Sequence, residues 1–290
     1  MGFRKSDRIA LALPNGPLLA YSIVAVSAGF GCAPLNPNYR AQEFEGLLTR
    51  LRVKALLVKR GEDSPARDVA KGRGIEVIDV DEPTQGERFL LGGLGDLQSD
   101  PKFSETGEDA FLLHTSGTTG APKLVPLTHS NICHSVHYIR NAMTLGTADR
   151  CLNVMPLFHG LGLVSLLSTL LSGGSIACAP GFHEDDFFLW LDRLRPTWYT
   201  AVPPVHQLIL NKAGKHSDVV ARSRLRFIRS AAAPLTPKLM LGLEACFNAP
   251  VVEAYGMTEA FLIGSTPLPP EKRKPGSVGV AMGPDMAVIS

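Results

Sequence analysis

Apolar and polar residues follow one another along this chain in blocks that predict strands and helices in alternation. In the N-terminal part, short apolar runs predict strands at residues 8–13, 53–58 and 75–80. Helical spacing of apolar positions predicts helices at residues 18–28, 41–52 and 65–71. Residues 29–38 are rich in glycine and proline and predict a loop. Because helical crossovers join parallel strands, this order indicates an α/β fold with a mostly parallel sheet.

The rest of the chain keeps this alternation without repeating the sequence. A polar excursion over residues 81–108 precedes a buried strand at 111–113, and a helix capped by Thr128 follows. Further strands are predicted at residues 149–156, 175–179, 198–202, 225–229 and 251–254. Helices are predicted at residues 161–171, 184–194, 205–212 and, after a Thr236 cap, up to 247. We expect a first α/β subdomain at residues 1–148 and a second at 149–266.

The stretch Leu113-His-Thr-Ser-Gly-Thr-Thr-Gly-Ala-Pro-Lys123 contains little that could build a core. Successive backbone N–H groups in a glycine-rich turn form a concave anion site, to which Lys123 adds a positive charge. The remaining donors and flexible positions are Thr115, Ser116, Gly117, Thr118, Thr119 and Gly120. An ordinary surface turn is the alternative. The spacing fits neither a P-loop, because Lys123 follows Pro122, nor a G-x-S-x-G elbow around Ser116. A polyphosphate is the ligand that this loop suits.

A second candidate segment, Tyr255-Gly-Met-Thr-Glu-Ala260, follows a predicted buried strand. Tyr255 could cover an adenine face, and Thr258 could donate to a phosphate. Glu259 could hold Mg²⁺, which prefers oxygen ligands. Taken alone, this segment also fits an ordinary strand exit.

Composition narrows the function classes. The 290 residues carry 29 basic and 27 acidic side chains, and this near balance gives no case for nucleic acid as a partner. The five cysteines form no C-x-x-C pair, which argues against a zinc site or a disulfide scaffold and fits a reducing, cytoplasmic location. No run of about 18 apolar residues predicts a membrane span.

The T-S-G-T-T-G-x-P-K loop, followed in the same chain by Y-G-M-T-E-A, resembles the two signatures of the adenylate-forming superfamily. That superfamily includes acyl-CoA synthetases, luciferases and peptide-synthetase adenylation domains. Residues 155–160 are similar to its P-x-F-H segment, and residues 230–235 to its G-G-A-P-L segment. The resemblance implies the two packed βα-layered subdomains of the family's large N-terminal domain. Residues 267–290 would begin its small β-barrel.

The resemblance implies ATP-dependent activation of a small carboxylic acid to acyl-adenylate and then acyl-CoA, with ATP, Mg²⁺ and coenzyme A. The catalytic residues would be Lys123, His159, Thr258 and Glu259, with Glu259 on the metal. Nucleotide contacts would come from Thr115, Ser116, Gly117, Thr118, Thr119, Gly120, Lys123, Ala232, Glu253, Ala254, Tyr255, Gly256 and Thr258. Acid contacts would come from His159, Ala231, Ala232, Ala233, Gly256 and Met257.

Within the superfamily, residues 266–287 resemble oxalate–CoA ligases, with three departures. Leu262 stands where that subfamily has a histidine, Ala231–Ala233 replace a serine-rich segment, and Leu161 replaces a second histidine. Burying a second carboxylate without partners costs several kcal/mol. The substitutions therefore predict a more apolar acid pocket and argue against oxalate itself.

The chain also lacks segments that the family carries at both ends, including the ribose-binding aspartate and the lid-domain lysine. Loss of such a preorganised cation typically costs about 10²–10³ in rate. Three alternatives therefore stay open: a nucleotide-binding remnant without turnover, an adenylation enzyme that loads a carrier protein, and a regulatory isoform that dimerises with full-length copies.

Overall fold

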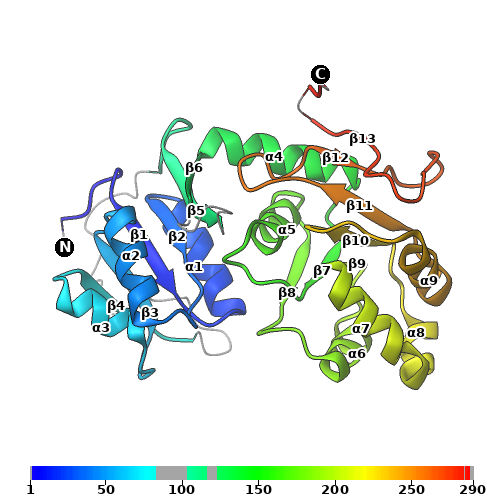
Figure 1. The fold of residues 1–290 in the computed structure, drawn as a ribbon, viewed down its shortest axis with the longest axis horizontal. Coiled ribbons are helices and arrows are strands. Elements are labelled where there is room, and N and C mark those ends of the chain that lie inside the picture. Colours follow the sequence, from blue (N-terminus) through cyan, green and yellow to red (C-terminus); the bar gives the residue numbers. More distant parts are fainter. Residues whose placement is uncertain (1, 83–102, 116–122, 284, 288–290) are drawn as a thin grey trace. The chain divides into compact units, whose positions relative to one another are not determined.

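The computed structural model describes residues 2–82, 103–115, 123–283 and 285–287 (Figure 1). The chain forms two compact units, Met1–Ile132 and Cys133–Ser290, and each is described by itself. The two units divide within helix α4 (His129–Ala142), sixteen residues before the subdomain boundary expected at residue 148. None of the helices in the described part of the chain has the length and apolar character needed to cross a membrane.

In the first unit, the described strands form a six-stranded sheet in the order β4-β3-β1-β2-β5-β6. All neighbours are parallel except β5 and β6, which pair antiparallel. The strands are β1 (Arg8–Ala12), β2 (Gly31–Pro34), β3 (Ala55–Lys59), β4 (Glu76–Val80), β5 (Asp109–Thr115) and β6 (Lys123–Thr128). This is the mostly parallel sheet that the alternation of elements predicts.

Helices cover both faces of this sheet: α2 (Ala41–Leu51) and α3 (Pro65–Gly72) lie on one side and α1 (Pro17–Ser27) on the other (Figure 1). The side of α2 that faces the sheet is the apolar stripe expected from its spacing, since Phe44, Leu47, Leu48 and Leu51 are all buried. At the start of α3, the Ser64 hydroxyl accepts a hydrogen bond from the Ala66 amide at 3.2 Å.

Two strands of this unit depart from the prediction. Residues 29–38, expected as a loop, contain the fully buried strand β2 between β1 and β5. A Cβ on Gly31 would lie 3.0 Å from the Leu112 side chain, so glycine here allows close strand packing. Strand β6 was not expected either; it contains Pro126 and lies at the sheet edge, where a missing N–H is tolerated.

In the second unit, the described strands form a seven-stranded sheet in the order β13-β12-β11-β10-β9-β7-β8. The five strands from β11 to β8 are parallel, whereas β12 and β13 add antiparallel. The strands are β7 (Arg150–Asn153), β8 (Ser175–Cys178), β9 (Trp198–Ala201), β10 (Phe227–Ala231), β11 (Val251–Tyr255), β12 (Gly264–Ser265) and β13 (Val280–Ala281).

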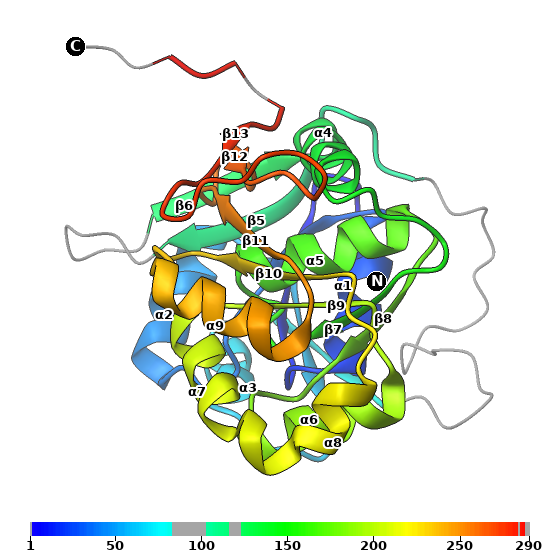
Figure 2. The same cartoon turned by 90° about the vertical axis from the view of Figure 1, so that its right-hand side faces the viewer.

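The two faces of this second sheet carry different helices (Figure 2). One face is covered by α5 (Gly160–Leu171). The other carries α6 (Glu184–Leu194), α7 (Pro203–Ala213), η1 (Gly214–His216), α8 (Ser217–Arg222) and α9 (Pro237–Phe247). The main core of the unit forms between the sheet and α6, α7 and α9, and includes Phe187, Tyr199, Ile209, Ile228 and Leu243.

Local signals for helix starts are confirmed. The Thr236 hydroxyl accepts from the Leu239 amide at 3.3 Å at the start of α9, and Thr128 accepts from the Asn131 amide at 3.2 Å. Strand β10, however, begins and ends two residues later than predicted. That shift places Arg229 in the middle of a fully buried strand rather than at its end.

Candidate nucleotide and acid site

A pocket of about 520 Å³ lies in the second unit, at the carboxyl ends of parallel strands. Four strands lead into it: β7 is followed by the segment to His159, β9 is followed by Val202, β10 ends at Ala231, and β11 ends at Tyr255. Ala231 and Ala254 are neighbours in register across β10 and β11. The carboxyl edge of a parallel sheet is where α/β proteins bind ligands, so this pocket is the candidate site.

The turn after β11 is tightly built around Gly256. A Cβ at this position would lie 1.8 Å from the carbonyl oxygen of Phe261, so no larger residue fits without movement of the backbone. Phe261 has a φ of 48°, and its amide donates to the Met257 carbonyl at 2.6 Å. The turn thereby holds Tyr255, Met257 and Thr258 at the pocket.

The groups at the pocket differ in their exposure. Tyr255, the last residue of β11, is 51% exposed, and Met257 in the turn after it is 49% exposed. Their exposed surfaces are available to cover a flat ligand such as a base. Apolar wall contacts come from Met155, Leu161, Val164, Val202 and Phe261.

His159 is the residue that precedes the first turn of α5, and its carbonyl accepts from the Leu163 amide at 3.0 Å. Its ring packs edge-on against Phe158, with 4.8 Å between ring centroids. Desolvation by its surroundings lowers the pKa of His159 below its ordinary value. The imidazole is therefore neutral at pH 7 and offers the pocket a hydrogen bond rather than a charge.

Arg229 is the charged side chain of the pocket that sequence reasoning missed. It is 1% exposed, and its guanidinium donates to the Ser165 hydroxyl on α5 at 3.2 Å. Burial lowers the pKa of Arg229 to about 10, so the group is still protonated at neutral pH. The available signal was an arginine that directly follows Phe227 and Ile228 in a predicted strand, since arginine is rarely fully buried unless it is paired.

The pocket brings together many, but not all, of the residues predicted for the site. Those that line it are His159, Ala231, Ala232, Ala254, Tyr255, Gly256, Met257 and Thr258. Ala233 and Glu259 are exposed outside this lining. Glu253 is buried, and its carboxylate accepts from the Leu235 amide at 3.0 Å, which ties β11 to the turn after β10. The roles assigned to these residues stay predictions.

The phosphate-loop residues belong to the first unit. Thr115 ends β5 and Lys123 begins β6, and the two residues pair directly across the antiparallel ladder. Lys123 is exposed. The predicted residues Ser116, Gly117, Thr118, Thr119 and Gly120 lie outside the described residues. The expected convergence of this loop with Tyr255–Glu259 on one nucleotide stays a prediction.

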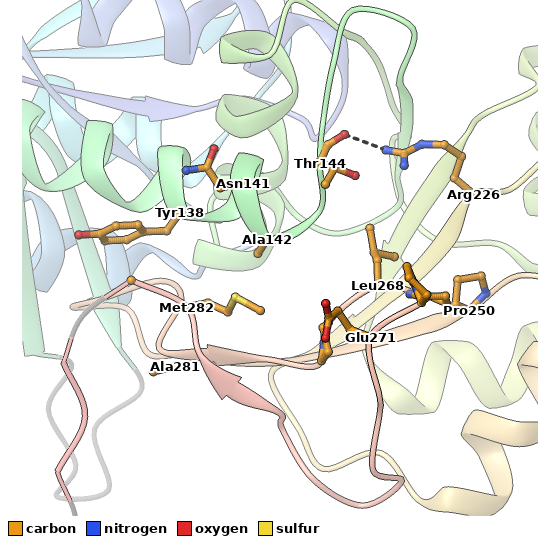
Figure 3. Close-up of a pocket in the computed structure, with 14 residues that line it drawn as sticks. Tyr138, Asn141, Ala142, Thr144, Arg226, Pro250, Leu268, Glu271, Ala281 and Met282 are labelled. Carbon is orange, nitrogen blue, oxygen red and sulfur yellow. Dashed lines mark hydrogen bonds between the residues drawn. The ribbon is translucent and has the colours of Figure 1, made fainter.

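A second pocket of the same unit, of about 920 Å³, contains none of the predicted site residues (Figure 3). Tyr138, Leu268, Glu271 and Met282 are among its lining residues. Its arginine, Arg226, forms two short contacts with the Asp149 carboxylate, at 2.8 and 2.9 Å, and donates to the Thr144 carbonyl at 3.3 Å. Because its charge is already neutralised, Arg226 has a structural role.

The fold and the pocket define an α/β protein with a candidate ligand site at the carboxyl edge of the parallel strands in its second unit. The model of the AMP-binding enzyme family matches residues 1–289, and the chain therefore belongs to that family. Its α/β architecture with two sheets is that of the N-terminal domain of acyl-CoA synthetases, as the sequence predicts.

Relatives of known name agree with this assignment. An oxalate–CoA ligase of Arabidopsis thaliana is 38% identical over 300 residues, which cover 100% of this chain and 58% of the relative. An oxalate–CoA ligase of Saccharomyces cerevisiae is 35% identical, covering 98% of this chain and 57% of that protein. The solved structure of ATP-bound MatB from Rhodopseudomonas palustris superposes with a TM-score of 0.82 at 25% identity, covering 97% of this chain and 55% of that one. The chain spans a little over half the length of these relatives.

Proposed function

We propose that this chain carries the adenylate-forming part of an ATP-dependent acid–CoA ligase. The observation that supports this most directly is the single pocket lined by His159, Ala232, Tyr255 and Thr258, which come from three separate strand ends. The membership of this chain in the AMP-binding enzyme family, and a relative named as an oxalate–CoA ligase, support acid activation as the chemistry of this pocket. One related structure is described as a malonyl-CoA ligase with methylmalonyl-CoA and AMP bound, which supports AMP as a product.

The proposed reaction has two steps. A carboxylate oxygen of the acid attacks the α-phosphorus of ATP, and the bond to the bridging oxygen breaks to release pyrophosphate. The sulfur of coenzyme A then attacks the acyl carbon, loses its proton, and displaces AMP. Holding the two reactants in line and neutralising phosphate charge supply most of the acceleration in such chemistry.

Each predicted residue has a part in this proposal. Thr115 and Lys123, with the loop between them, would hold the β- and γ-phosphates. Tyr255 and Ala232 would flank the adenine, and Thr258 would donate to the α-phosphate. The acid would lie against His159, whose neutral ring can donate an N–H hydrogen bond to a carboxylate oxygen.

Magnesium would neutralise phosphate charge, and the described residues fit the way in which this ion is usually held. Mg²⁺ commonly takes one or two protein carboxylates and completes its shell with phosphate oxygens and water. Among the described residues there is no group of three or more metal-binding side chains, whereas the exposed Glu259 follows the pocket residue Thr258. Glu259 would therefore be the protein ligand, with the nucleotide supplying the others.

We also propose that the acid pocket is more apolar than that of an oxalate–CoA ligase. Phe261 lines the pocket, and the adjacent Leu262, where a histidine is expected in that subfamily, is fully buried. Ala231 and Ala232 offer no hydroxyl where that subfamily has serines. These walls suit the hydrocarbon part of an acid larger than oxalate.

The function is tested by incubating the chain with ATP, magnesium and single carboxylic acids, with hydroxylamine to trap acyl-adenylate as hydroxamate. Hydroxamate with at least one acid is the expected result. A comparison of acyl transfer to coenzyme A and to a carrier protein then identifies the thiol acceptor. ATP binding seen by calorimetry without hydroxamate from any acid would contradict ligase activity in this chain and support the nucleotide-binding remnant.

A further inference from the structure

Arg229 is a buried cation that lacks a counter-ion among the described residues. Its Nη1 donates to Ser165, whose hydroxyl in turn donates to the Leu161 carbonyl at 2.7 Å, so this contact is between neutral and charged groups. Its Nε has no partner, and no carboxylate of the described chain forms an ion pair with it. Buried charges are normally paired, because desolvating an unpaired charge is strongly unfavourable.

The surroundings of Arg229 do not neutralise it. Burial raises the pKa of the nearby Cys151 well above its ordinary value, so that sulfur is an uncharged thiol. Thr200, the neighbour of Arg229 in register on β9, is fully buried, and the described residues give its hydroxyl no hydrogen-bond partner. A guanidinium without a counter-ion among the described residues therefore lies next to a hydroxyl without a hydrogen-bond partner among them, on one face of the sheet.

The same face forms the wall of the candidate site. Arg229 and Ala231 are two positions apart on β10, so both side chains face the side covered by α5, and both line the pocket. The first turns of α5 line it too, through Leu161 and Val164. An anion that enters this pocket could therefore pair with the Arg229 guanidinium, which has no counter-ion among the described residues.

A second arginine nearby, Arg226, differs from Arg229 in having a carboxylate partner. Arg226 immediately precedes the same strand and is neutralised by both oxygens of Asp149. Within the described part of the chain, Arg226 therefore has a carboxylate partner, whereas Arg229 at the pocket has none. That difference points to a ligand as the partner of Arg229.

We propose that Arg229 binds a second anionic group of the substrate acid, so that the preferred substrate is a short acid with two anionic ends joined by an apolar spacer, such as a dicarboxylate. This inference rests on the proposed function, since one carboxylate must remain free for adenylation. The apolar walls contact the spacer, and Arg229 selects against acids that end in a methyl group.

The test compares acids of equal length with the chain and its variants, using succinate against butyrate in the hydroxamate assay. The unmodified chain is expected to prefer succinate. Arg229→Met should lower kcat/KM for succinate roughly 100-fold and leave that for butyrate unchanged or higher, since a buried charge pair is lost. Arg229→Lys should restore part of the preference, and Arg222→Met, which removes an exposed arginine, should change neither value.

Thermal unfolding separates this role from a structural one. Because Arg229→Met removes an unpaired buried charge, it should leave the midpoint of the ligand-free chain unchanged or raise it. A lowered midpoint together with an equal loss for both acids would overturn the proposal and make Arg229 a scaffold residue. A preference of the unmodified chain for butyrate would overturn it as well.

Calorimetric titration with succinate and butyrate keeps the inference testable even where no hydroxamate forms. Saturable succinate binding that Arg229→Met loses supports the anion site, although ligase activity would then have failed in this chain. Equal binding of both acids, or of succinate by both proteins, contradicts the anion site whatever the outcome for the ligase.

Discussion

At the scale of single residues, charged side chains that pair with each other stabilise the fold, whereas exposed charged side chains are available to bind a ligand. Burial raises the pKa of Asp149, but hydrogen bonds from Arg226, the Gly146 amide and Thr197 outweigh it and hold that pKa below its ordinary value. Asp149 and Arg226 therefore form a satisfied structural pair. Lys123 and Glu259, in contrast, are exposed and suited to a charged ligand.

The proposed phosphate and metal contacts give the first prediction. Lys123→Ala and Glu259→Ala should each reduce ATP–pyrophosphate exchange by roughly tenfold or more, as loss of a charge-stabilising group does. The exposed Lys238 and Glu76 provide matched controls, and their alanine variants should exchange at the unmodified rate. Unchanged exchange in both site variants would refute these two roles.

His206 gives a prediction on pH. This fully buried ring contacts the Tyr199 hydroxyl at 3.2 Å through Nδ1, and burial lowers its pKa to about 4. An unfolded histidine has a pKa of about 6.5. Because the unfolded state then binds the proton more readily, stability is full above pH 6.5 and falls as the pH drops toward 4, by roughly 3 kcal/mol in all.

Urea unfolding at pH 7, 6 and 5 checks this expectation. The variant His206→Asn keeps a polar atom near the Tyr199 hydroxyl but cannot take up a proton in this range. Its free energy of unfolding should fall less between pH 7 and pH 5 than that of the unmodified chain. Parallel decreases in the two proteins would show that other groups cause the acid sensitivity.

At the residue scale, the sequence motifs named several side chains that line one pocket, and the roles assigned to them stay predictions. His159, Tyr255 and Thr258 are predicted site residues, and the structure brings all three to one pocket. Arg229 could not be assigned in this way, because its importance depends on a missing partner rather than on a motif. Glu253 is the opposite case: it was predicted as a nucleotide contact because it precedes a motif, and its carboxylate already accepts a hydrogen bond from the Leu235 amide.

At the scale of elements, the turn between β11 and β12 connects the sheet to the pocket. Phe261 adopts a left-handed conformation, which costs energy for a residue with a side chain, and its carbonyl lies against Gly256. The turn is therefore held by close packing of backbone on backbone. Its shape determines where Met257 and Thr258 stand.

Substitution of the glycine tests this account. Gly256→Ala should lower the free energy of unfolding by about 1–3 kcal/mol, because the added methyl group displaces the Phe261 backbone. It should also weaken ATP binding in calorimetry. Gly46→Ala is the control: this glycine lies in α2 with open space around it, and alanine there should raise stability by about 0.5–1 kcal/mol. Equal stability of the two variants would contradict the packing argument.

Helices were easier to predict than strands for physical reasons. The apolar face of α2 and the Thr236 cap of α9 depend on residues a few positions apart, so both can be recognised directly in the sequence. Strand β2 is only four residues long and contains glycine and proline, and its pairing with β1 and β5 stabilises it. Pairing between distant segments overrides local preference there.

At the scale of the whole molecule, the chain has two units with separate hydrophobic cores. The core of the first includes Phe44, Leu48 and Leu56, and that of the second includes Phe187, Tyr199 and Leu243. The proposed phosphate contacts belong to the first unit and the proposed adenine contacts to the second. The proposed function therefore requires one nucleotide to contact both units.

Hydrogen exchange tests this requirement. ATP with magnesium should slow amide exchange at Lys123 in the first unit and at Tyr255–Thr258 in the second at the same time. Tripolyphosphate should protect the first set alone, and adenosine the second. Protection of only one unit by ATP would show that the two segments do not share a nucleotide.

The hydrogen bond between Arg229 and Ser165 has an evolutionary consequence. If Arg229 is lost first, Ser165 still has the Leu161 carbonyl as a partner. If Ser165 is lost first, Arg229 loses the one side-chain contact that the described residues give it. A lineage that moved toward uncharged substrates would therefore be expected to replace the arginine before the serine, and ancestral reconstructions should preserve that historical order.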